Sequence, residues 1–358
     1  MRQYHNLLKK IISEGEIQFE PRTQMYTIGL PGAQSIYDLR EGFPQMTTKN
    51  VPLRLPGEEL FWKMRGERSV KSLFDRNVHI WDANAFDHWL KRTGKGKEFP
   101  KHTKKWDDKF SEYCARLVND SEAEELGDLG PVYGYQWRKG FNRDGQDIDQ
   151  LKNVIDGLKK NPGSRYHLLT AWNPSDLPDQ AIGPCPMIHQ FSAFGNNLHL
   201  NVYQRSCDTF LGVPFNISQD SLLLSLVAKE VGLTPAKFVH SYGNVHIYLG
   251  VSPRADFWTN ASNVSDFRRK FSEVENLEGY IELKKLYEES APEESQINAR
   301  KDHIPFVLEQ LSKLIMGLPN LNLEDIPLFE AIKMPLGKVA SLINYNPHKW
   351  DAKAVMAA

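Results

Sequence analysis

The chain has little of three things that would place it in a specialised class of protein. It has only 3 cysteines, Cys114, Cys185 and Cys207, and no CxxC spacing. A disulfide scaffold or a zinc site is therefore not expected, and we predict no metal. No apolar run approaches the roughly 20 residues that a membrane-spanning helix needs. We therefore expect a cytoplasmic protein with reduced cysteines.

The chain also lacks net charge. Its 44 basic and 45 acidic residues leave a formal charge of −1. Such a protein has no general field that attracts DNA, RNA or an anionic membrane surface. A small anionic substrate would have to be held by a local group of arginines.

The remaining composition fits one large domain. The 358 residues are 41% hydrophobic, which is enough for a substantial core. Alternating apolar residues predict a strand within 186–206, and apolar residues at helical spacing predict a helix over 218–232 with Ser218 as its N-cap. Residues 253–325 are more polar and mostly helical in pattern. We therefore predict a single α+β domain over 1–358, with a helical elaboration at about 253–325.

The stretch from residue 183 to residue 216 contains the residues most suggestive of chemistry. Cys185 lies between Pro184 and Pro186. A lone cysteine is usually a small buried apolar residue. Prolines on both sides, however, favour a strand edge or bulge, and Arg205 on a neighbouring strand would favour the reactive thiolate. We interpret Cys185 as a nucleophile.

Arginine and serine follow one another at Arg205 and Ser206. A bidentate fork beside a hydroxyl group suits a phosphate, although a surface salt bridge is the simpler interpretation. Arg22 and Arg165 also lie in otherwise uncharged stretches. They would join a phosphate site only if the fold brought them together.

Asn216 could read a flat polar ring. Its amide offers one donor and one acceptor, which match O4 and N3–H of uracil, whereas a carboxylate would better match cytosine. Taken alone, a position two residues before Ser218 favours helix capping instead.

Three other residues are weaker candidates. His246 and Tyr248 share one strand face by parity and could hold a sugar hydroxyl, or simply form a half-buried face. Glu59 lies on an apolar helix and could relay protons. However, Glu58 and Glu59 are adjacent, and one of them could face solvent.

Many motifs, in this order, resemble the thymidylate synthase family. The resemblance covers about residues 1–250 and the last dozen residues, and it is carried by the segments 21–23, 43–49, 80–84, 128–138, 171–174, 184–185, 204–216 and 246–248. It implies an α+β fold in which a twisted mixed sheet is packed with helices. It also implies a homodimer in which two subunits pack sheet against sheet.

The family resemblance implies a covalent mechanism. Cys185 would add to C6 of a pyrimidine nucleotide such as dUMP, and C5 would then take the one-carbon unit of 5,10-methylenetetrahydrofolate. Loss of the C5 proton and of the folate leaves an exocyclic methylene. Hydride from the folate would make it a methyl group, and water would make it a hydroxymethyl group.

The resemblance also implies roles for individual residues. Arg22, Arg205 and Ser206 would hold the nucleotide phosphate, with Arg165 reaching it from the partner subunit. Asn216 would read the base, His246 and Tyr248 would bind the sugar hydroxyl, and Glu59 would organise water and protons with Tyr133 nearby. Asp208 would serve both the nucleotide and the folate. The other residues expected at the folate are Ile80, Trp81, Asn84, Gly212, Phe215, Lys49 at its glutamate tail, and Ala358 in a closing C-terminal segment.

Two departures from the family pattern lie around the base carbonyl. Pro186 stands where the synthases carry histidine after the nucleophile, and Gln219 stands where they carry serine. His189 follows on the same strand face, but four residues at roughly 3.3 Å each put it too far away to substitute. The retained catalytic residues with a rebuilt polar network predict a phage-type deoxyuridylate hydroxymethylase, which uses water in place of hydride.

Two alternatives stay open at this point. A divergent thymidylate synthase is supported by the family-like tail 355–358, since an intact lid excludes water. A non-catalytic homologue that binds nucleotide or RNA is the more remote alternative, because Cys185, Glu59, Asn216 and Arg205 are all kept.

Overall fold

The computed structural model describes residues 1–119, 121–294 and 302–350. Its centre is one six-stranded sheet with the strand order β1-β2-β8-β7-β6-β5. The strands of this sheet are β1 (Glu16–Glu20), β2 (Met25–Asp38), β5 (Leu168–Thr170), β6 (Pro186–Phe194), β7 (Asn197–Asp208) and β8 (Thr234–Gly250). Neighbours are antiparallel except for β7 and β8, which are parallel. The mixed sheet confirms the predicted α+β class.

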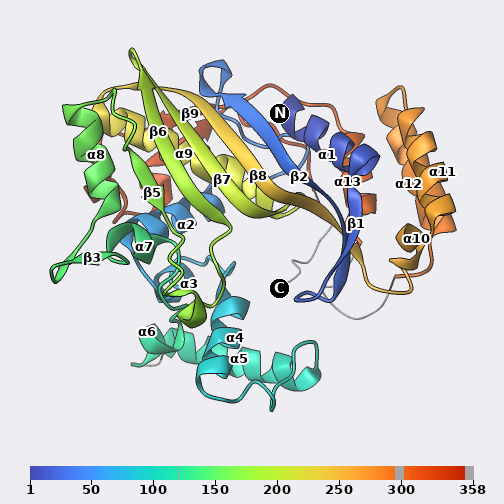
Figure 1. Cartoon of the computed structure of the whole chain (residues 1–358), viewed down its shortest axis with the longest axis horizontal. Helices are drawn as coiled ribbons and strands as arrows, with labels where there is room; N and C mark the ends of the chain where they lie inside the picture. Colours follow the sequence, from blue (N-terminus) through green and yellow to red (C-terminus); the bar gives the residue numbers. More distant parts are fainter. Residues whose placement is uncertain (120, 295–301, 351–358) are drawn as a thin grey trace.

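Helices pack on one face of this sheet and leave the other face open (Figure 1). The longer ones are α1 (Arg2–Glu14), α2 (Arg54–Arg65), α4 (Asp82–Arg92), α5 (Lys104–Asn119), α8 (Gln150–Lys160), α9 (Gly212–Val231), α11 (Ala261–Ser272), α12 (Leu277–Ser290) and α13 (Ile304–Leu311). The short ones are α3 (Lys71–Phe74), α6 (Ala123–Leu126), α7 (Gly134–Arg138), α10 (Asp256–Thr259) and α14 (Leu328–Ala331), with 3-10 turns at Leu39–Glu41, Leu177–Asp179 and Leu336–Lys338. Two small hairpins complete the chain: β3 (Asn142–Arg143) with β4 (Gln146–Asp147), and β9 (Asn320–Leu323) with β10 (Ala340–Ile343).

The covered face of the sheet is apolar because its strands alternate. Leu198, Leu200 and Val202 of β7 are fully buried and point toward α9. On the opposite face, Ile36, Phe194 and Tyr203 remain exposed. The alternation that predicts the strand is therefore also what makes one face of the sheet available to another surface.

The helix α9 crosses between the two parallel strands and begins earlier than its sequence suggests. It starts at Gly212, and Ser218 lies a full turn inside it, fully buried and donating a hydrogen bond to Oε1 of Gln45 (2.7 Å). The prediction that Ser218 is the N-cap is therefore wrong. The helix absorbs polar residues into its first turns because their side chains find buried partners, which a sequence pattern does not reveal.

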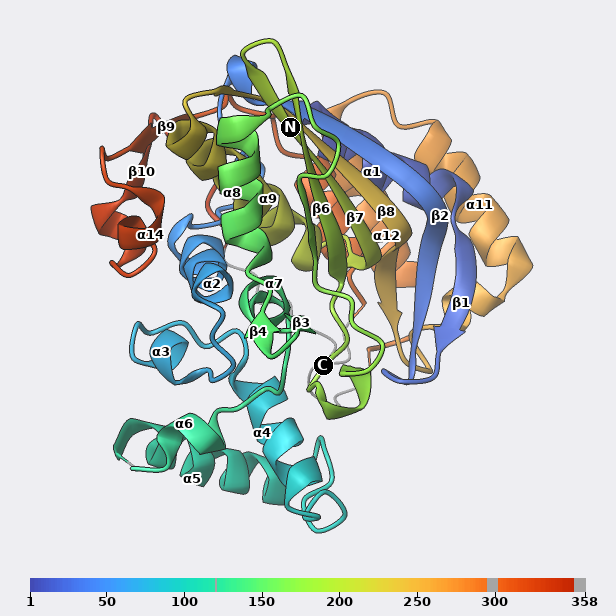
Figure 2. The same cartoon turned by 60° about the vertical axis from the view of Figure 1, so that its left-hand side comes forward.

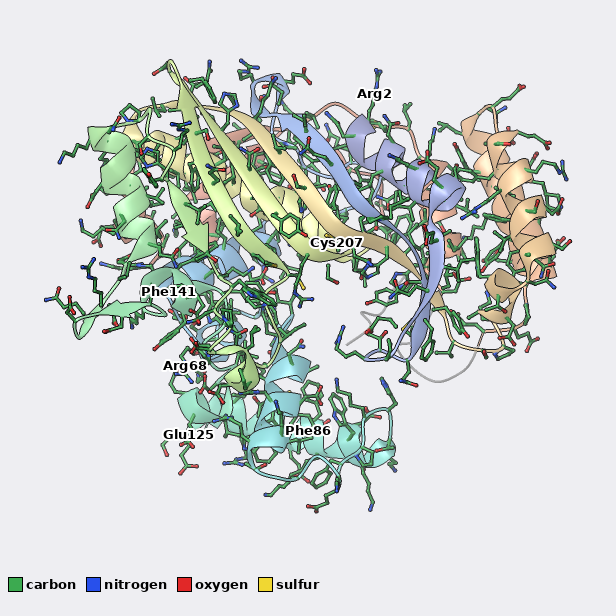
Figure 3. The ribbon with its side chains drawn as sticks, viewed as in Figure 1. Arg2, Arg68, Phe86, Glu125, Phe141 and Cys207 are labelled. Carbon is green, nitrogen blue, oxygen red and sulfur yellow. The ribbon has the colours of Figure 1, made fainter. Side chains whose placement is uncertain are left out.

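Residues 68–130 form a lower group of helices with an aromatic core of its own (Figures 2 and 3). Phe86 of α4 lies between Trp106, Phe110 and Tyr113 of α5, with ring centroids 5.1–5.5 Å apart. This cluster supports α4, which carries residues expected at the folate.

The segment 253–325, described over 253–294 and 302–325, places α11 and α12 beside α1 at the edge of the sheet (Figure 1), whereas its β9 pairs with β10. Its helices are α10 to α13, and their buried side chains belong to the same hydrophobic core as α9. A buried ion pair between Arg254 and Asp302 (2.9 Å) ties the start of this segment to the residues just before α13. The α13 helix ends at Leu311, with Ser312 as its C-cap residue.

The contact between α2 and α7 gives a first prediction. A Cβ added at Gly134 would lie 1.9 Å from the backbone oxygen of Lys63, so a Gly134→Ala variant must push the two helices apart. Overpacking of this kind typically costs about 1–3 kcal/mol. Urea unfolding should show that loss of stability. Gly163→Ala, which meets no atom within 4 Å, should unfold like the wild type, and equal stability of the two variants would contradict the packing described here.

Candidate active site

A cavity of about 410 Å³ opens at the end of the sheet where β6, β7 and β8 meet α2 and α9. It is lined by Arg22, Glu59, Lys63, Ile80, Trp81, Asn84, Tyr133, Ile182, Cys185, Pro186, Gln204, Ser206, Asp208, Leu211, Gly212, Phe215, Asn216, His246 and Tyr248. Most residues that the sequence selects thus come together from distant parts of the chain.

Cys185 stands at the entrance of β6, as the two prolines predict. The pairing of β6 with β7 is irregular between Pro186 and Ile188. The guanidinium of Arg205 donates to the carbonyl oxygens of Gly183 (2.6 Å) and Pro184 (2.9 Å), and its Nη2 lies 4.0 Å from Sγ of Cys185. These bonds hold the thiol in the cavity next to a positive charge.

The other two thiols are not competitors. Cys207 is fully buried within β7 (Figure 3), and burial raises the pKa of its thiol well above the usual range. Burial also raises the pKa of Cys114, on α5, to about 11. A thiol that resists ionisation is a poor nucleophile. Among the cysteines, only Cys185 is found with the residues that line the described cavity.

The arginines are only partly assembled. Arg22 and Ser206 line the cavity, and Arg205 borders it through Cys185. Two of the Arg205 nitrogens are already used on backbone carbonyls, so its fork is not wholly free for a phosphate. Arg165 is exposed in the loop before β5 and does not line the cavity. Its expected reach into a partner subunit stays a prediction.

Asn216 lies in the first turns of α9 with its amide facing the cavity. Its Oδ1 accepts a hydrogen bond from Nε2 of Gln204 (3.1 Å), and the same Nε2 donates to the carbonyl oxygen of Ser206 (3.0 Å). A backbone carbonyl can only accept, so the Gln204 amide has one orientation. Asn216 therefore keeps its NH₂ group away from Gln204 and cannot flip without losing a bond.

A buried histidine completes this chain of bonds. His240 lies 2.8 Å from Oε1 of Gln204, and burial lowers its pKa to about 4, so the ring is neutral near pH 7. Its Nε2 must then carry the proton that Oε1 accepts. His240 and Gln204 together set the polarity of Asn216.

His246 and Tyr248 share one face of β8, as parity predicts, and both line the cavity. Their rings meet edge to face with centroids 5.2 Å apart. Burial lowers the pKa of His246, and its Nδ1 lies 2.9 Å from Oδ1 of Asn244. Burial and then the nearby Asp208 raise the pKa of Tyr248, so it remains a hydroxyl donor.

Neither glutamate of the α2 pair faces solvent, contrary to the alternative that the sequence allows. Glu58 is 3% exposed and is paired with Arg76 (2.7 Å) away from the cavity. Glu59 is 8% exposed and faces the cavity. Its Oε1 accepts from Nε1 of Trp81 (2.9 Å) and its Oε2 accepts from Nε2 of Gln219 (2.7 Å).

Tyr133 has an unusual backbone, with φ 32° and ψ −96° just before α7. A non-glycine residue in such a conformation stores about 1–3 kcal/mol of strain, which is typical of functional sites. Its hydroxyl oxygen accepts from the backbone N–H of Cys185 (3.2 Å). Burial, and then Cys185, raises the pKa of Tyr133 well above its usual value, so the hydroxyl keeps its proton.

One part of the cavity wall suits a flat ring. It combines the aromatic and aliphatic side chains of Ile80, Trp81 and Phe215 with Asn84 and the bare backbone of Gly212. Oδ2 of Asp208 is buried without a hydrogen-bond partner, which leaves an acceptor for an N–H group of a ligand. These residues fit a folate.

One residue expected at the folate, Lys49, does not line this wall. Lys49 is 5% exposed, donates to the carbonyl oxygen of Phe210 and lies 3.8 Å from the centre of that ring. Burial lowers the pKa of Lys49 to about 7, so this lysine is only partly protonated at neutral pH and is a poorer partner for a glutamate tail. Ala358 lies outside the described residues.

The structure adds residues to the site that the sequence does not select, together with Gln219, which the sequence marks only as a departure from the family pattern. Lys63 lines the cavity beside Glu59, and Gln204 and Gln219 orient Asn216 and Glu59. A lysine four residues after a glutamate on an otherwise apolar helix is a signal that could have found Lys63. His189 turns into the core, where its Nε2 lies 3.2 Å from Asp220, and so does not replace the missing histidine.

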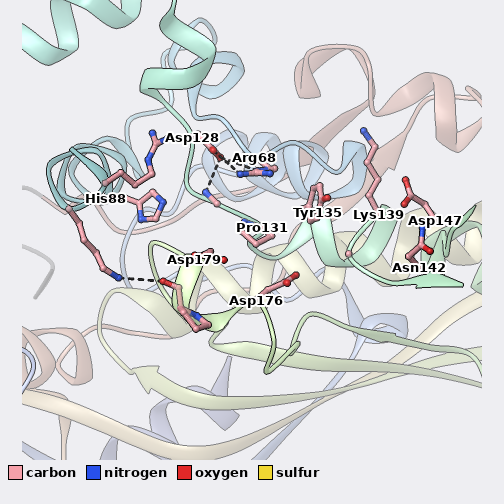
Figure 4. Close-up of a pocket in the computed structure, with 15 residues that line it drawn as sticks. Arg68, His88, Asp128, Pro131, Tyr135, Lys139, Asn142, Asp147, Asp176 and Asp179 are labelled. Atoms are coloured by element: carbon pink, nitrogen blue, oxygen red, sulfur yellow. Dashed lines mark hydrogen bonds and ion pairs between the residues drawn. The ribbon is translucent and has the colours of Figure 1, made fainter. Parts of the chain in front are cut away.

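A second, larger cavity of about 700 Å³ lies between the lower helices and the β3–β4 hairpin (Figure 4). Within it, Arg68 pairs with Asp128 (2.7 Å) and Lys91 reaches the carbonyl oxygen of Pro178 (3.5 Å). It contains no cysteine among its described lining residues. Size therefore does not identify the reactive site, whereas the thiol does.

The described residues also bear on membrane-spanning helices and metal sites. None of the helices in the described ranges is long and apolar enough to cross a membrane. Within the same ranges, no cluster of three or more histidine, cysteine, aspartate or glutamate residues is arranged to hold a metal ion.

The cavity unites the thiol of Cys185, the amide of Asn216 and a group of aromatic and aliphatic side chains, as the family resemblance implies. Comparison with protein families gives the same answer for nearly the whole chain. The family model described as Thymidylate synthase matches residues 2–358. The chain therefore belongs to the thymidylate synthase family, whose members transfer a one-carbon unit from methylenetetrahydrofolate to C5 of dUMP.

Proposed function

We propose that this protein is a deoxyuridylate hydroxymethylase. It would join dUMP, 5,10-methylenetetrahydrofolate and water to give 5-hydroxymethyl-dUMP and tetrahydrofolate. The observation that carries the proposal is the rebuilt network beside the reacting base. Pro186 takes the family's histidine position, and Gln219 occupies the serine position with its amide bonded to Glu59 (2.7 Å).

The first steps follow from Cys185 and Asn216. The thiolate forms a bond to C6 of dUMP, which makes C5 nucleophilic toward the methylene of the folate. Asn216 donates to O4, where negative charge develops, and accepts from N3–H. Arg205, 4.0 Å from Sγ, stabilises the thiolate before addition and after its departure.

The last steps distinguish the product. Loss of the C5 proton and breakage of the bond to the folate nitrogen, which takes up a proton, leave an exocyclic methylene on C5. A water oxygen then bonds to that methylene, Glu59 accepts the proton of the water, and the bond from Cys185 to C6 breaks. Glu59 suits this role because its carboxylate lies at the cavity and is held by neighbours on both oxygens.

The family also suggests a homodimer, which we propose through the open face of the sheet. Ile36, Phe194 and Tyr203 are exposed there, and an exposed apolar face favours association. Arg165 and Tyr166 lie exposed beside the edge strand β5, with Tyr166 93% exposed. They are the residues that we propose approach the partner's phosphate site.

The nucleophile is tested by Cys185→Ser. Turnover should be abolished while nucleotide binding persists, because an alcohol is a far weaker nucleophile than a thiolate at neutral pH. Steady-state rates and dUMP titrations would be compared with Cys114→Ser, a variant on the distant α5. Turnover of the Cys185→Ser enzyme within a few-fold of wild type would remove Cys185 from the mechanism.

The base reader is tested by Asn216→Asp. The carboxylate can accept from the 4-amino group of cytosine but cannot donate to O4, so preference should move from dUMP toward dCMP. A mismatched buried hydrogen bond costs about 1–3 kcal/mol, which corresponds to a shift of roughly 5- to 150-fold in the ratio of kcat/KM values. An unchanged ratio would show that Asn216 does not read the base.

The reaction itself is tested by its folate product. Hydroxymethylation should yield tetrahydrofolate and 5-hydroxymethyl-dUMP, with no stoichiometric rise in dihydrofolate absorbance. Mass spectrometry of the nucleotide would accompany the absorbance trace. Dihydrofolate formed in step with dTMP as the sole product would replace this proposal with a thymidylate synthase.

A further inference from the structure

A lysine is buried inside the reactive cavity. Lys63 of α2 is 3% exposed and lines the cavity with Glu59 and Cys185. Its Nζ lies 3.1 Å from Oε1 of Glu59 and donates to Oε1 of Gln219 (2.8 Å). It also lies 4.5 Å from the centre of the Tyr133 ring, whose face attracts a cation. Lysine is almost never buried unless it is paired in this way.

The orientation of Gln219 is dictated by the backbone. Its Nε2 donates to the carbonyl oxygen of Pro56 (2.9 Å), which can only accept. Its Oε1 must therefore be the atom that faces Lys63, and its Nε2 also donates to Oε2 of Glu59 (2.7 Å). Gln219 thus links the ammonium and the carboxylate as a bridge with a fixed direction.

The carboxylate of Glu59 is consequently almost saturated. Oε1 receives Trp81 and Lys63, and Oε2 receives Gln219. A carboxylate has about four sites for hydrogen-bond donors, so about one site remains, on Oε2. Because Glu59 lines the cavity, that site is available to a water molecule next to the reacting carbon.

Packing does not explain the lysine. The neighbouring side chains Leu60, Phe61 and Met64 of α2 are fully buried and apolar. Replacing a buried ion pair by apolar residues is often neutral or stabilising, so stability alone does not account for this pair. Violations of local rules of this kind are concentrated at functional sites.

We propose that Lys63 is a positioning residue of the catalytic centre. It balances the charge of Glu59 and, through Gln219, holds the carboxylate with one accepting site toward the reacting methylene. This inference rests on the proposed role of Glu59 as the proton acceptor, but not on which product is released. Lys63 and Gln219 form the network that stands in place of the family's histidine and serine.

The test is a double-mutant cycle with Glu59→Gln, Lys63→Met and the double variant. Lys63→Met should lower kcat by about 100-fold, the lower end of what a positioned general base contributes, with KM for dUMP changed less than about threefold. Because Lys63 acts through Glu59, the double variant should be no slower than Glu59→Gln alone. Lys152→Met, at an exposed lysine on α8, is the matched control.

Folding is checked for each variant by thermal unfolding, because Lys63→Met leaves a buried carboxylate unpaired. The double variant carries neither charge. If Lys63→Met does not fold, comparison of the kcat of the double variant with that of Glu59→Gln tests the proposal. The proposal would be overturned if the double variant lost kcat by the product of the two single-variant factors. It would also be overturned if the Lys63→Met enzyme kept the wild-type kcat. A fully active Glu59→Gln enzyme would instead remove Glu59 from the proposed function, and its single-variant rate distinguishes that failure.

Discussion

The register of β7 against its two neighbours is the constraint on which the active site depends. Gln204 lies opposite Pro186 on β6, and Asp208 lies opposite His246 on β8. These two pairings bring the loop that carries Cys185, the Gln204 amide and His246 to one end of the sheet. A slip of one residue would turn each of these side chains to the other face of the sheet. The buried apolar alternation of β7 therefore also determines which side chains reach the cavity.

Near the cavity, the orientation of two side-chain amides is set by backbone carbonyl oxygens, which can only accept hydrogen bonds. The carbonyl of Ser206 orients Gln204 and thereby Asn216, and the carbonyl of Pro56 orients Gln219 and thereby Glu59. Two amides thus transmit a fixed orientation from the backbone to Asn216 and Glu59, which both line the cavity. In a buried site such networks specify one arrangement, because each alternative leaves a polar group unsatisfied.

The sequence predicts much of this site, and the failures have physical causes. Cys185, Asn216, His246 and Tyr248 reach the cavity because strand parity and short motifs carry their positions. Ser218 is assigned wrongly because a tertiary partner, Gln45, satisfies it within the helix. Sequence patterns do not reveal hydrogen-bond partners that are distant in the chain.

The environment of charged side chains is the other feature that the sequence does not reveal. Both glutamates of α2 are buried because each has a partner distant in sequence or on the next helical turn. Lys49 is counted as a folate ligand from its motif, yet the structure places its ammonium against the Phe210 ring. The helical elaboration at about 253–325 has the predicted helices, but its sharing of the sheet's core could be seen only in three dimensions.

The central claim is that water, not hydride, completes the reaction. It is tested most directly by turnover in heavy-oxygen water, followed by mass spectrometry of the nucleotide. The account predicts one heavy oxygen atom in the product, carried by its new hydroxymethyl group. A product that carries a methyl group and no heavy oxygen would contradict it.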